Sequence, residues 1–196
     1  MHALLDAVGA FMAGGAILLT LFSALLNIQG HAYNTTMQVT TNQSAERITS
    51  ALEDYLSYVA SGSDVDPSTA VTQAEIRLFS YTGKIQDDLA VHNYVVMQGT
   101  QDGTTGWWPI QIFEDGSQIM GDVWADQEFE FLYYDEDGVQ IPFIGFGQVH
   151  SSNLPNIRSI SVNMSLVSRG WEHGADVTNV HNSIVFWKFF KNMYMQ

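Results

Sequence analysis

The sequence predicts an α+β protein in which a long N-terminal α-helix packs on a C-terminal antiparallel β-sheet domain. Two observations support this prediction. Residues 4–60 contain no proline and show first a continuous apolar run and then an amphipathic helical pattern. Residues 75–190 contain short β-branched or aromatic runs separated by Asp-Gly and other glycine turns. We therefore expect a helix over residues 1–62 and a globular β-sheet domain over residues 63–196.

The first part of the predicted helix is apolar enough to cross a membrane. Residues 4–28 would form a helix of ~37 Å, which exceeds the ~30 Å hydrocarbon core of a bilayer. Asp6 is the only Asp, Glu, Lys or Arg before Glu46. A cleaved secretory signal is disfavoured because it would be shorter and begin with basic residues. An ordinary anchor also has Lys or Arg on its cytoplasmic side, and such residues are missing here unless a positively charged leader was removed.

The second part of the predicted helix is amphipathic. Ile48, Leu52, Tyr55, Leu56 and Val59 recur at spacings of three and four residues, which predicts one apolar face toward the β-sheet domain. Residues 34–44 are rich in Thr and Asn, so the sequence leaves open a break in the helix there. Gly62 and Pro67 then predict a stop and a linker.

The predicted strands lie in five segments of the C-terminal part. Strict alternation of apolar and polar residues in two of these segments indicates half-buried antiparallel strands. The segments comprise residues 75–83, 93–120, 129–147, 157–168 and 182–190.

Composition excludes several classes of function. The chain has 196 residues, a formal net charge of −14 and only seven Lys and Arg residues, which argues against a nucleic-acid partner. There is no Cys, so a thiolate metal site and a thiol nucleophile are excluded. The six His residues show no metal-binding spacing, and no nucleophile elbow, phosphate loop or dinucleotide fingerprint is present. We predict neither an enzyme nor a bound cofactor.

Three local motifs admit a functional and a structural interpretation. Asp135 and Asp137 could bind Ca²⁺, but further ligands at set offsets are missing, so an Asp-Gly hairpin turn is favoured. Trp107 and Trp108 suit either a sugar-stacking platform or, as we favour, a structural role as an aromatic cover on the sheet or a subunit contact. Candidate N-glycosylation sites with the Asn-x-Ser/Thr pattern occur at Asn34, Asn42 and Asn163.

The order of these segments resembles the type IV pilin superfamily, which includes pseudopilins and minor pilins. The similarity rests on the long apolar helix with one acid near its start. It extends to "SAERITSALEDYLSYVASG", "IRLFSYTGKIQDDL", "FEFLYYDEDGVQI" and "IRSISVNMSLVSRG", which follow one another as in pilin-like proteins.

The resemblance implies a role for the first residues of the chain. In this family a prepilin peptidase removes a basic leader, the new N-terminus is methylated, and a nearby acid pairs with the N-terminal amine of a neighbouring subunit. Here the assembly residues would be Asp6 and the terminal Met1. If Met1 is the processed N-terminus, Asp6 comes one position later than the usual acid of the family. If His2 is the processed N-terminus, Asp6 occupies the usual position of the acid. The family usually has Glu at this position and Phe at the processed end, so this chain departs from it at both.

Small residues near Asp6 suggest close packing or local melting of the helix. Gly9, Ala13 and Gly14 present small surfaces for helix contact. Gly14 and Gly15 also form a weak point in the helix, because each Gly costs up to ~1 kcal/mol relative to Ala.

The resemblance implies a structural subunit of an extracellular type IV pilus-like filament, or fimbrium, that polymerises through its apolar helix. Its partners would be copies of itself, the pilus assembly machinery, the prepilin peptidase and, before assembly, the inner or cytoplasmic membrane. The filament would then lie at the cell surface. The alternative is a single-pass membrane-anchored extracytoplasmic binding or envelope-complex subunit that does not polymerise.

Overall fold

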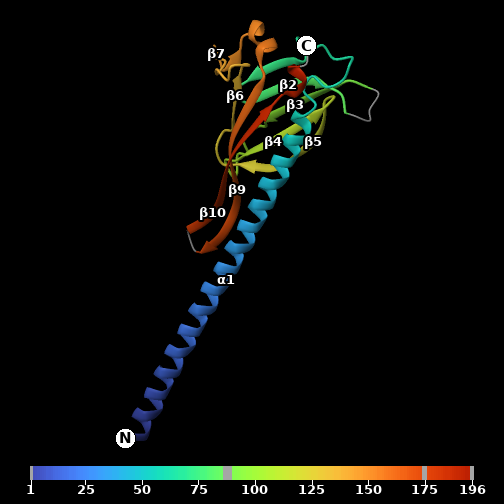
Figure 1. Cartoon of the computed structure of the whole chain (residues 1–196). Helices are drawn as coiled ribbons and strands as arrows, with labels where there is room; N and C mark the ends of the chain where they lie inside the picture. The colour runs from blue at the N-terminus through green and yellow to red at the C-terminus, as the bar shows by residue number, and fades with distance from the viewer. Residues whose placement is uncertain (1, 86–89, 174–175, 195–196) are drawn as a thin grey trace.

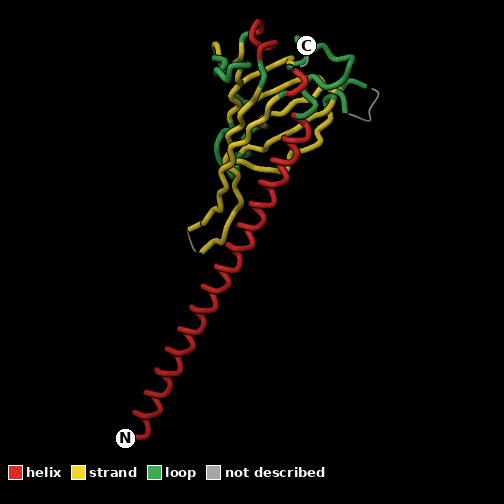
Figure 2. Tube along the Cα trace, viewed as in Figure 1, coloured by secondary structure: helices red, strands yellow, loops and turns green. Residues whose placement is uncertain are grey.

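One long helix and one curled antiparallel sheet make up the protein (Figure 1). The computed structural model describes residues 2–85, 90–173 and 176–194. Helix α1 (His2–Leu56) contains 55 residues and is therefore about 80 Å long. Its N-terminal end lies far from the sheet, whereas its C-terminal end packs against the sheet (Figures 1 and 2). The predicted α+β arrangement is confirmed.

Helix α1 continues through residues 34–44, where the sequence left open a break. Four threonines in this stretch bond within the helix instead of competing with it. The hydroxyl of each donates to the carbonyl oxygen four residues earlier, at 2.8 to 3.0 Å, in Thr35, Thr36, Thr40 and Thr41. This back-bonding satisfies the hydroxyl groups while the main chain remains helical.

The amphipathic half of α1 provides one side of the hydrophobic core. Ile48, Leu52 and Leu56 are at most 1% exposed, Tyr55 is half-buried against them, and Val59 in the turns after the helix is also buried. The predicted apolar face is confirmed, because these residues repeat at helical spacing and all point toward the sheet.

The end of the helix differs from the prediction. Helix α1 ends at Leu56, six residues before the predicted end at residue 62, and the chain continues to Ala60 in hydrogen-bonded turns. The amide groups of Ser57 and Tyr58 donate to the carbonyl oxygens three residues earlier, which tightens this last segment. Ala60 then has a φ of 54°, so the helix cannot propagate through it.

Within the described ranges, ten strands form one sheet, and all of their pairings are antiparallel. The sheet order is β10-β9-β5-β4-β3-β2-β1-β8-β7, and β6 pairs with β9 outside this path. Short 3₁₀ turns, η1 (Ser151–Asn156) and η2 (Lys191–Met193), flank the last two strands. The strands are β1 (Val71–Glu75), β2 (Leu78–Gly83), β3 (His92–Gln98), β4 (Trp108–Glu114), β5 (Ser117–Ala125), β6 (Glu130–Tyr134), β7 (Phe143–Ile144), β8 (Gln148–Val149), β9 (Ser159–His173) and β10 (Asp176–Phe189).

The strand boundaries correct the prediction in two places. The predicted strand over residues 75–83 is the end of β1, a turn at residues 76–77, and β2. Strands β9 and β10 extend beyond the predicted segments, to His173 and from Asp176. The extended hairpin runs beside α1 (Figure 2), and the Asn182 amide nitrogen donates to the Asn42 side-chain oxygen at 3.0 Å.

Polar contacts join α1 to the sheet around the apolar core. The Tyr81 hydroxyl donates to the carbonyl oxygen of Tyr55 at 2.6 Å, and the Lys188 ammonium donates to that of Glu53 at 3.0 Å. Arg47 of α1 pairs with Asp122 of β5, and this hydrogen bond lowers the pKa of the Asp122 carboxyl group. The second half of α1 and the sheet therefore form one folded unit.

Gly83 is the last residue of β2 and lies against the turns that follow α1. We expect Gly83→Ala to destabilise the fold by about 2 kcal/mol. A Cβ atom there would lie 1.8 Å from the carbonyl oxygen of Tyr58, so the main chain would have to shift. Gly103→Ala is the matched control, because a Cβ atom at Gly103 meets nothing within 4 Å. Urea unfolding of the full chain in detergent measures both variants. Equal unfolding midpoints for the two variants would contradict the close packing at Gly83.

Candidate assembly surface

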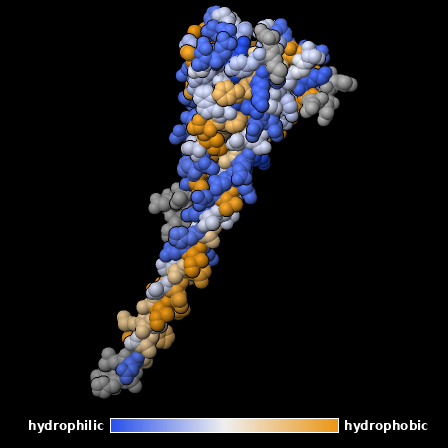
Figure 3. All heavy atoms as spheres, in the orientation of Figure 1, coloured by the Kyte–Doolittle hydropathy of each residue, from blue (hydrophilic) through white to orange (hydrophobic). Residues whose placement is uncertain are grey.

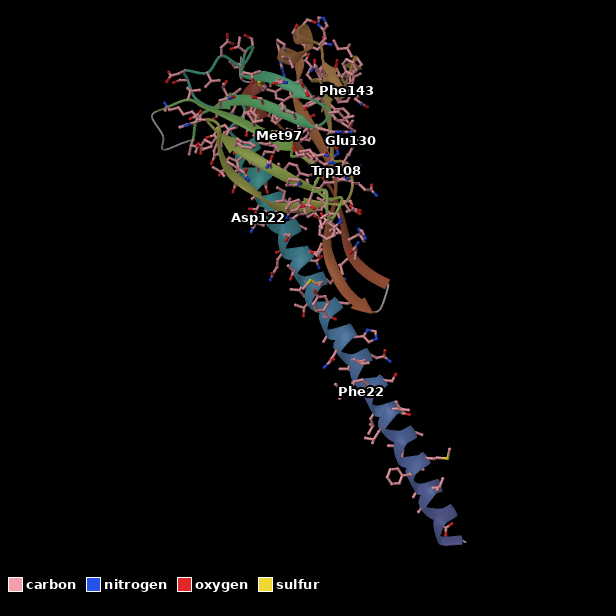
Figure 4. The ribbon with its side chains drawn as sticks, turned by 180° about the vertical axis from the view of Figure 1, so that it is seen from behind. Phe22, Met97, Trp108, Asp122, Glu130 and Phe143 are labelled. Atoms are coloured by element: carbon pink, nitrogen blue, oxygen red, sulfur yellow. The ribbon has the colours of Figure 1, made fainter. Side chains whose placement is uncertain are left out.

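The N-terminal half of α1 projects from the folded domain as an uncovered apolar surface. Its large apolar side chains are 50–87% exposed, and the labelled Phe22 points away from the helix with no other element beside it (Figure 4). Figure 3 shows this half as the most hydrophobic part of the visible surface. The exposed side chains are Val8, Phe11, Met12, Ile17, Leu18, Leu19, Leu21, Phe22, Leu25 and Ile28.

An apolar surface of this extent is unusual for a soluble monomer, which rarely exposes more than several hundred Å² in one patch. Among the described residues, α1 is the one helix that is long and apolar enough to cross a membrane. Either lipid or other copies of the helix can remove this apolar surface from water.

Asp6 places one exposed carboxylate at the beginning of this surface. Gly9 and Ala13 follow at offsets of three and seven residues, so they share a helix face with Asp6. Met1, the other residue assigned to assembly, lies outside the described residues. The structure therefore presents the acid beside small residues, where a second helix can approach it closely.

The three glycines of this segment have open space beside them in the part of the chain that the structure describes. A Cβ atom added to Gly9, Gly14 or Gly15 would meet nothing within 4 Å. Helix α1 is continuous at Gly14 and Gly15, and local melting of the helix at these glycines during assembly stays a prediction. Each glycine weakens the helix by about 1 kcal/mol relative to alanine.

The candidate glycosylation sites lie on two elements. Asn34 and Asn42 belong to α1, and Asn163 belongs to β9. Asn34 is half-buried, whereas Asn42 and Asn163 are exposed. The side-chain oxygen of Asn42 accepts the hydrogen bond from Asn182 described above. Glycosylation at these sites remains a prediction.

Asp135 and Asp137 lie in the turn that follows β6. One Asp135 carboxylate oxygen accepts from the amides of Asp137 and Val139, at 3.0 and 2.8 Å. Gly138 has a φ of 74°, which favours glycine at this position of the turn. The Asp135 side chain thus stabilises the hairpin turn. No group of three or more His, Asp or Glu side chains suited to a metal ion occurs in the part of the chain that the structure describes.

Trp107 and Trp108 lie at the start of β4 and are both half-buried. Trp108 pairs with Ala125 of β5, and Pro109 beside it is buried (Figure 4 labels Trp108). Both residues are therefore partly covered and not fully exposed.

The sequence interpretation missed a second apolar surface, on β10. Val185, Trp187 and Phe189 are 66%, 46% and 60% exposed. Their spacing of two residues within the predicted strand was the available signal. This surface has no counterpart among the motifs considered above.

Comparison of the chain with protein-family models, curated proteins and solved structures finds no match. The function must therefore be inferred from the chemistry of α1 and of the β-sheet domain.

Proposed function

We propose that the chain is a structural subunit of an extracellular type IV pilus-like filament and that it polymerises through the apolar half of α1. The observation that carries this proposal is the exposed apolar surface over residues 6–28, which projects from a folded domain and begins with a lone acid. A surface of this kind requires either lipid or protein around it.

The apolar half of α1 has two successive environments in this proposal. It first crosses the inner or cytoplasmic membrane, where a prepilin peptidase processes the chain and assembly machinery receives it. On assembly the helix leaves the lipid and packs against the helices of other copies. Lipid and the filament core are both apolar, so the hydrophobic effect does not favour one over the other. Close packing at small residues therefore supplies much of the free energy that favours the filament over the membrane. Gly9, Ala13 and Gly14 offer such positions.

Asp6 directs the assembly by pairing with the N-terminal amine of a neighbouring copy. An isolated carboxylate in an apolar bundle is strongly disfavoured. A charged amine at 4 Å provides about 4 kcal/mol of attraction at an effective dielectric constant near 20. The pair therefore favours one register between neighbouring helices over registers that leave the acid alone.

The β-sheet domain forms the outer surface of the filament. The chain has 21 acidic residues and seven basic ones, and all but one of the acids lie from Glu46 onward. The charged residues thus remain in water while the nearly uncharged segment is buried.

A single-pass anchor that does not polymerise would also contain an exposed apolar helix. Glycines such as Gly9, Gly14 and Gly15 suit the helix of an anchor as well as a filament core. The two functions differ at Asp6, because an anchor has no neighbouring amine with which this acid must pair.

Two measurements on one sample test the proposed function. Surface material sheared from cells that express the full gene is viewed by electron microscopy, and the intact mass of the chain in that material is determined. We expect filaments that contain a processed, methylated chain. An unprocessed and unmethylated chain, together with an absence of filaments, would refute the proposal.

A further inference from the structure

One of the three candidate glycosylation sites, Asn163, lies on the face of the sheet that points away from α1. Asn163 of β9 pairs with Glu130 of β6 on one side and with Val185 of β10 on the other, so the three side chains share a face. The opposite face of β10 is the one that meets the helix, because the Lys188 ammonium donates to the carbonyl oxygen of Glu53 on α1. The site therefore faces solvent in the isolated chain.

The Asn163 side chain is available for modification. It is exposed, and among the residues that the structure describes its amide makes no hydrogen bond. Ser165, which completes the Asn-x-Ser pattern, follows two residues later on the same face of β9. The amide nitrogen can therefore gain a covalent substituent without loss of a contact within the folded domain.

The other two candidate sites are less open. Asn34 is half-buried on α1, and the side-chain oxygen of Asn42 accepts a hydrogen bond from Asn182 at 3.0 Å. At both positions β9 and β10 already lie beside the helix (Figure 2). A glycan is bulky, so the open face at Asn163 accommodates it best.

Exposed apolar side chains lie beside Asn163 on the same face. Val185, Trp187 and Phe189 are 66%, 46% and 60% exposed, and we call these three side chains the β10 patch. Val185 is the direct partner of Asn163, and Trp187 is the partner of Ser161, two residues before it. Diagonal neighbours of this kind lie about 7–8 Å apart across strands. A substituent on Asn163 would therefore lie next to the patch.

The β10 patch is too small to bind a separate partner firmly. It exposes on the order of 300 Å², given the area of aromatic side chains. A stable protein interface buries about 800 Å² on each side. A ligand that is covalently linked to the same face needs far less affinity, because a short linker gives it an effective concentration in the millimolar range. The small area therefore favours an occupant that is attached to the chain itself.

The side chains around Asn163 match the chemistry of a sugar. A sugar ring presents hydroxyl groups at its rim and C–H groups on its faces. The Glu130 carboxylate, labelled in Figure 4, can accept hydrogen bonds from hydroxyl groups on one side of Asn163. Val185 and Trp187 offer apolar surface to C–H groups on the other side.

We propose that Asn163 carries an N-linked glycan and that its first sugars cover the β10 patch. The proposal rests on one part of the proposed function, namely that the β-sheet domain lies outside the membrane, and a membrane anchor that does not polymerise shares this part.

The modification requires a lipid-linked sugar phosphate as co-reactant and a transferase. The Asn163 side-chain nitrogen attacks the anomeric carbon of the sugar. A C–N bond forms while the bond between that carbon and the phosphate oxygen breaks. The lipid phosphate leaves with the electron pair, and the nitrogen loses one proton to a base of the transferase. Because β9 is paired on both sides at Asn163, the transfer precedes formation of the sheet.

Peptide mass spectrometry of the full chain, purified from the cells in which its gene occurs naturally, tests the modification. We expect the peptide that contains Asn163 to carry the mass of a glycan. Ser165→Ala keeps the asparagine but removes the Asn-x-Ser pattern, so this mass should be lost. Ser183→Ala is the matched control, because Ser183 is exposed on β10 outside any such pattern, and the mass should remain. An unmodified Asn163 in the mature chain would overturn the proposal.

Hydroxyl-radical labelling of the full chain in detergent tests whether the glycan covers the patch. A sugar contact with a dissociation constant of about 1 mM would be occupied about half of the time at a millimolar effective concentration. We therefore expect Trp187 to be oxidised about twofold more slowly in the glycosylated chain than in Ser165→Ala. Phe146, fully exposed in the turn between β7 and β8, should react equally in both. Equal rates at Trp187 in a chain that carries the glycan would refute the cover.

This proposal and the proposed function fail in different ways. Filaments whose chains are unmodified at Asn163 would refute the glycan and leave the filament in place. A chain that is glycosylated at Asn163 but forms no filaments would retain the glycan and refute polymerisation. Absence of both would refute both proposals.

Discussion

Asp6→Asn abolishes filaments, or reduces their number at least about tenfold, if the acid pairs with the N-terminal amine of a neighbouring copy. The substitution keeps the size and hydrogen-bonding capacity of the side chain but removes its charge. The amine of the neighbour then lies in an apolar bundle without a counter-charge, which costs several kcal/mol. Electron microscopy of sheared surface material, normalised to the amount of chain in the membrane, measures the effect.

Glu46→Gln is the matched control for Asp6→Asn. Glu46 is also an exposed acid on α1, but it lies beside the β-sheet domain and beyond the apolar segment. We expect Glu46→Gln to assemble normally. Normal filaments from Asp6→Asn as well would contradict the proposed pairing and would favour a membrane anchor, which tolerates either residue.

The helix could be predicted from the sequence because its signals are local. The spacing of Ile48, Leu52 and Val59 determines which face of α1 is buried, and no proline interrupts the chain before Pro67. Its exact end and its unbroken middle could not be predicted. The first depends on turns that end at Ala60, and the second depends on threonine hydroxyls that bond within the helix.

The length of the β9–β10 hairpin depends on pairing between distant residues. The residues of β9 and β10 beyond the predicted segments include glycine, histidine and acids and show no clear alternation. Strand structure arises there because the two strands pair with each other from Ser159 and Phe189 to His173 and Asp176. A window of local sequence contains little of this information.

The candidate sites also differ in whether local sequence reveals them. Asp6 stands out in the sequence because no other charge lies near it. The exposed Trp187 and Phe189 of β10 do not, because the paired Ser159 and Ser161 resemble the polar face of an ordinary half-exposed strand. Only the register across β6, β9 and β10 shows that aromatic rings cover these serines. Local sequence does not show which residues become neighbours across strands, and these neighbours decide which side chains are covered.

The two halves of α1 should respond in opposite ways to the same substitution. Leu52 is 1% exposed in the core, so Leu52→Ala should destabilise the folded domain by about 3 kcal/mol through lost contacts and the cavity that remains. Leu18 is 68% exposed on the same helix, so Leu18→Ala should change the free energy of unfolding by less than about 0.5 kcal/mol. Urea unfolding of the full chain in detergent measures both values.

Filament yield should separate these variants further, because Leu18 has a packing role only when other copies surround it. Leu18→Ala should lower the yield although the domain is fully folded, since helices in an apolar core associate through close packing. Leu52→Ala should lower the amount of folded chain first, and its filament yield per folded chain should stay unchanged. A normal yield from Leu18→Ala would show that this side chain remains in lipid and would count against burial of the apolar half between copies.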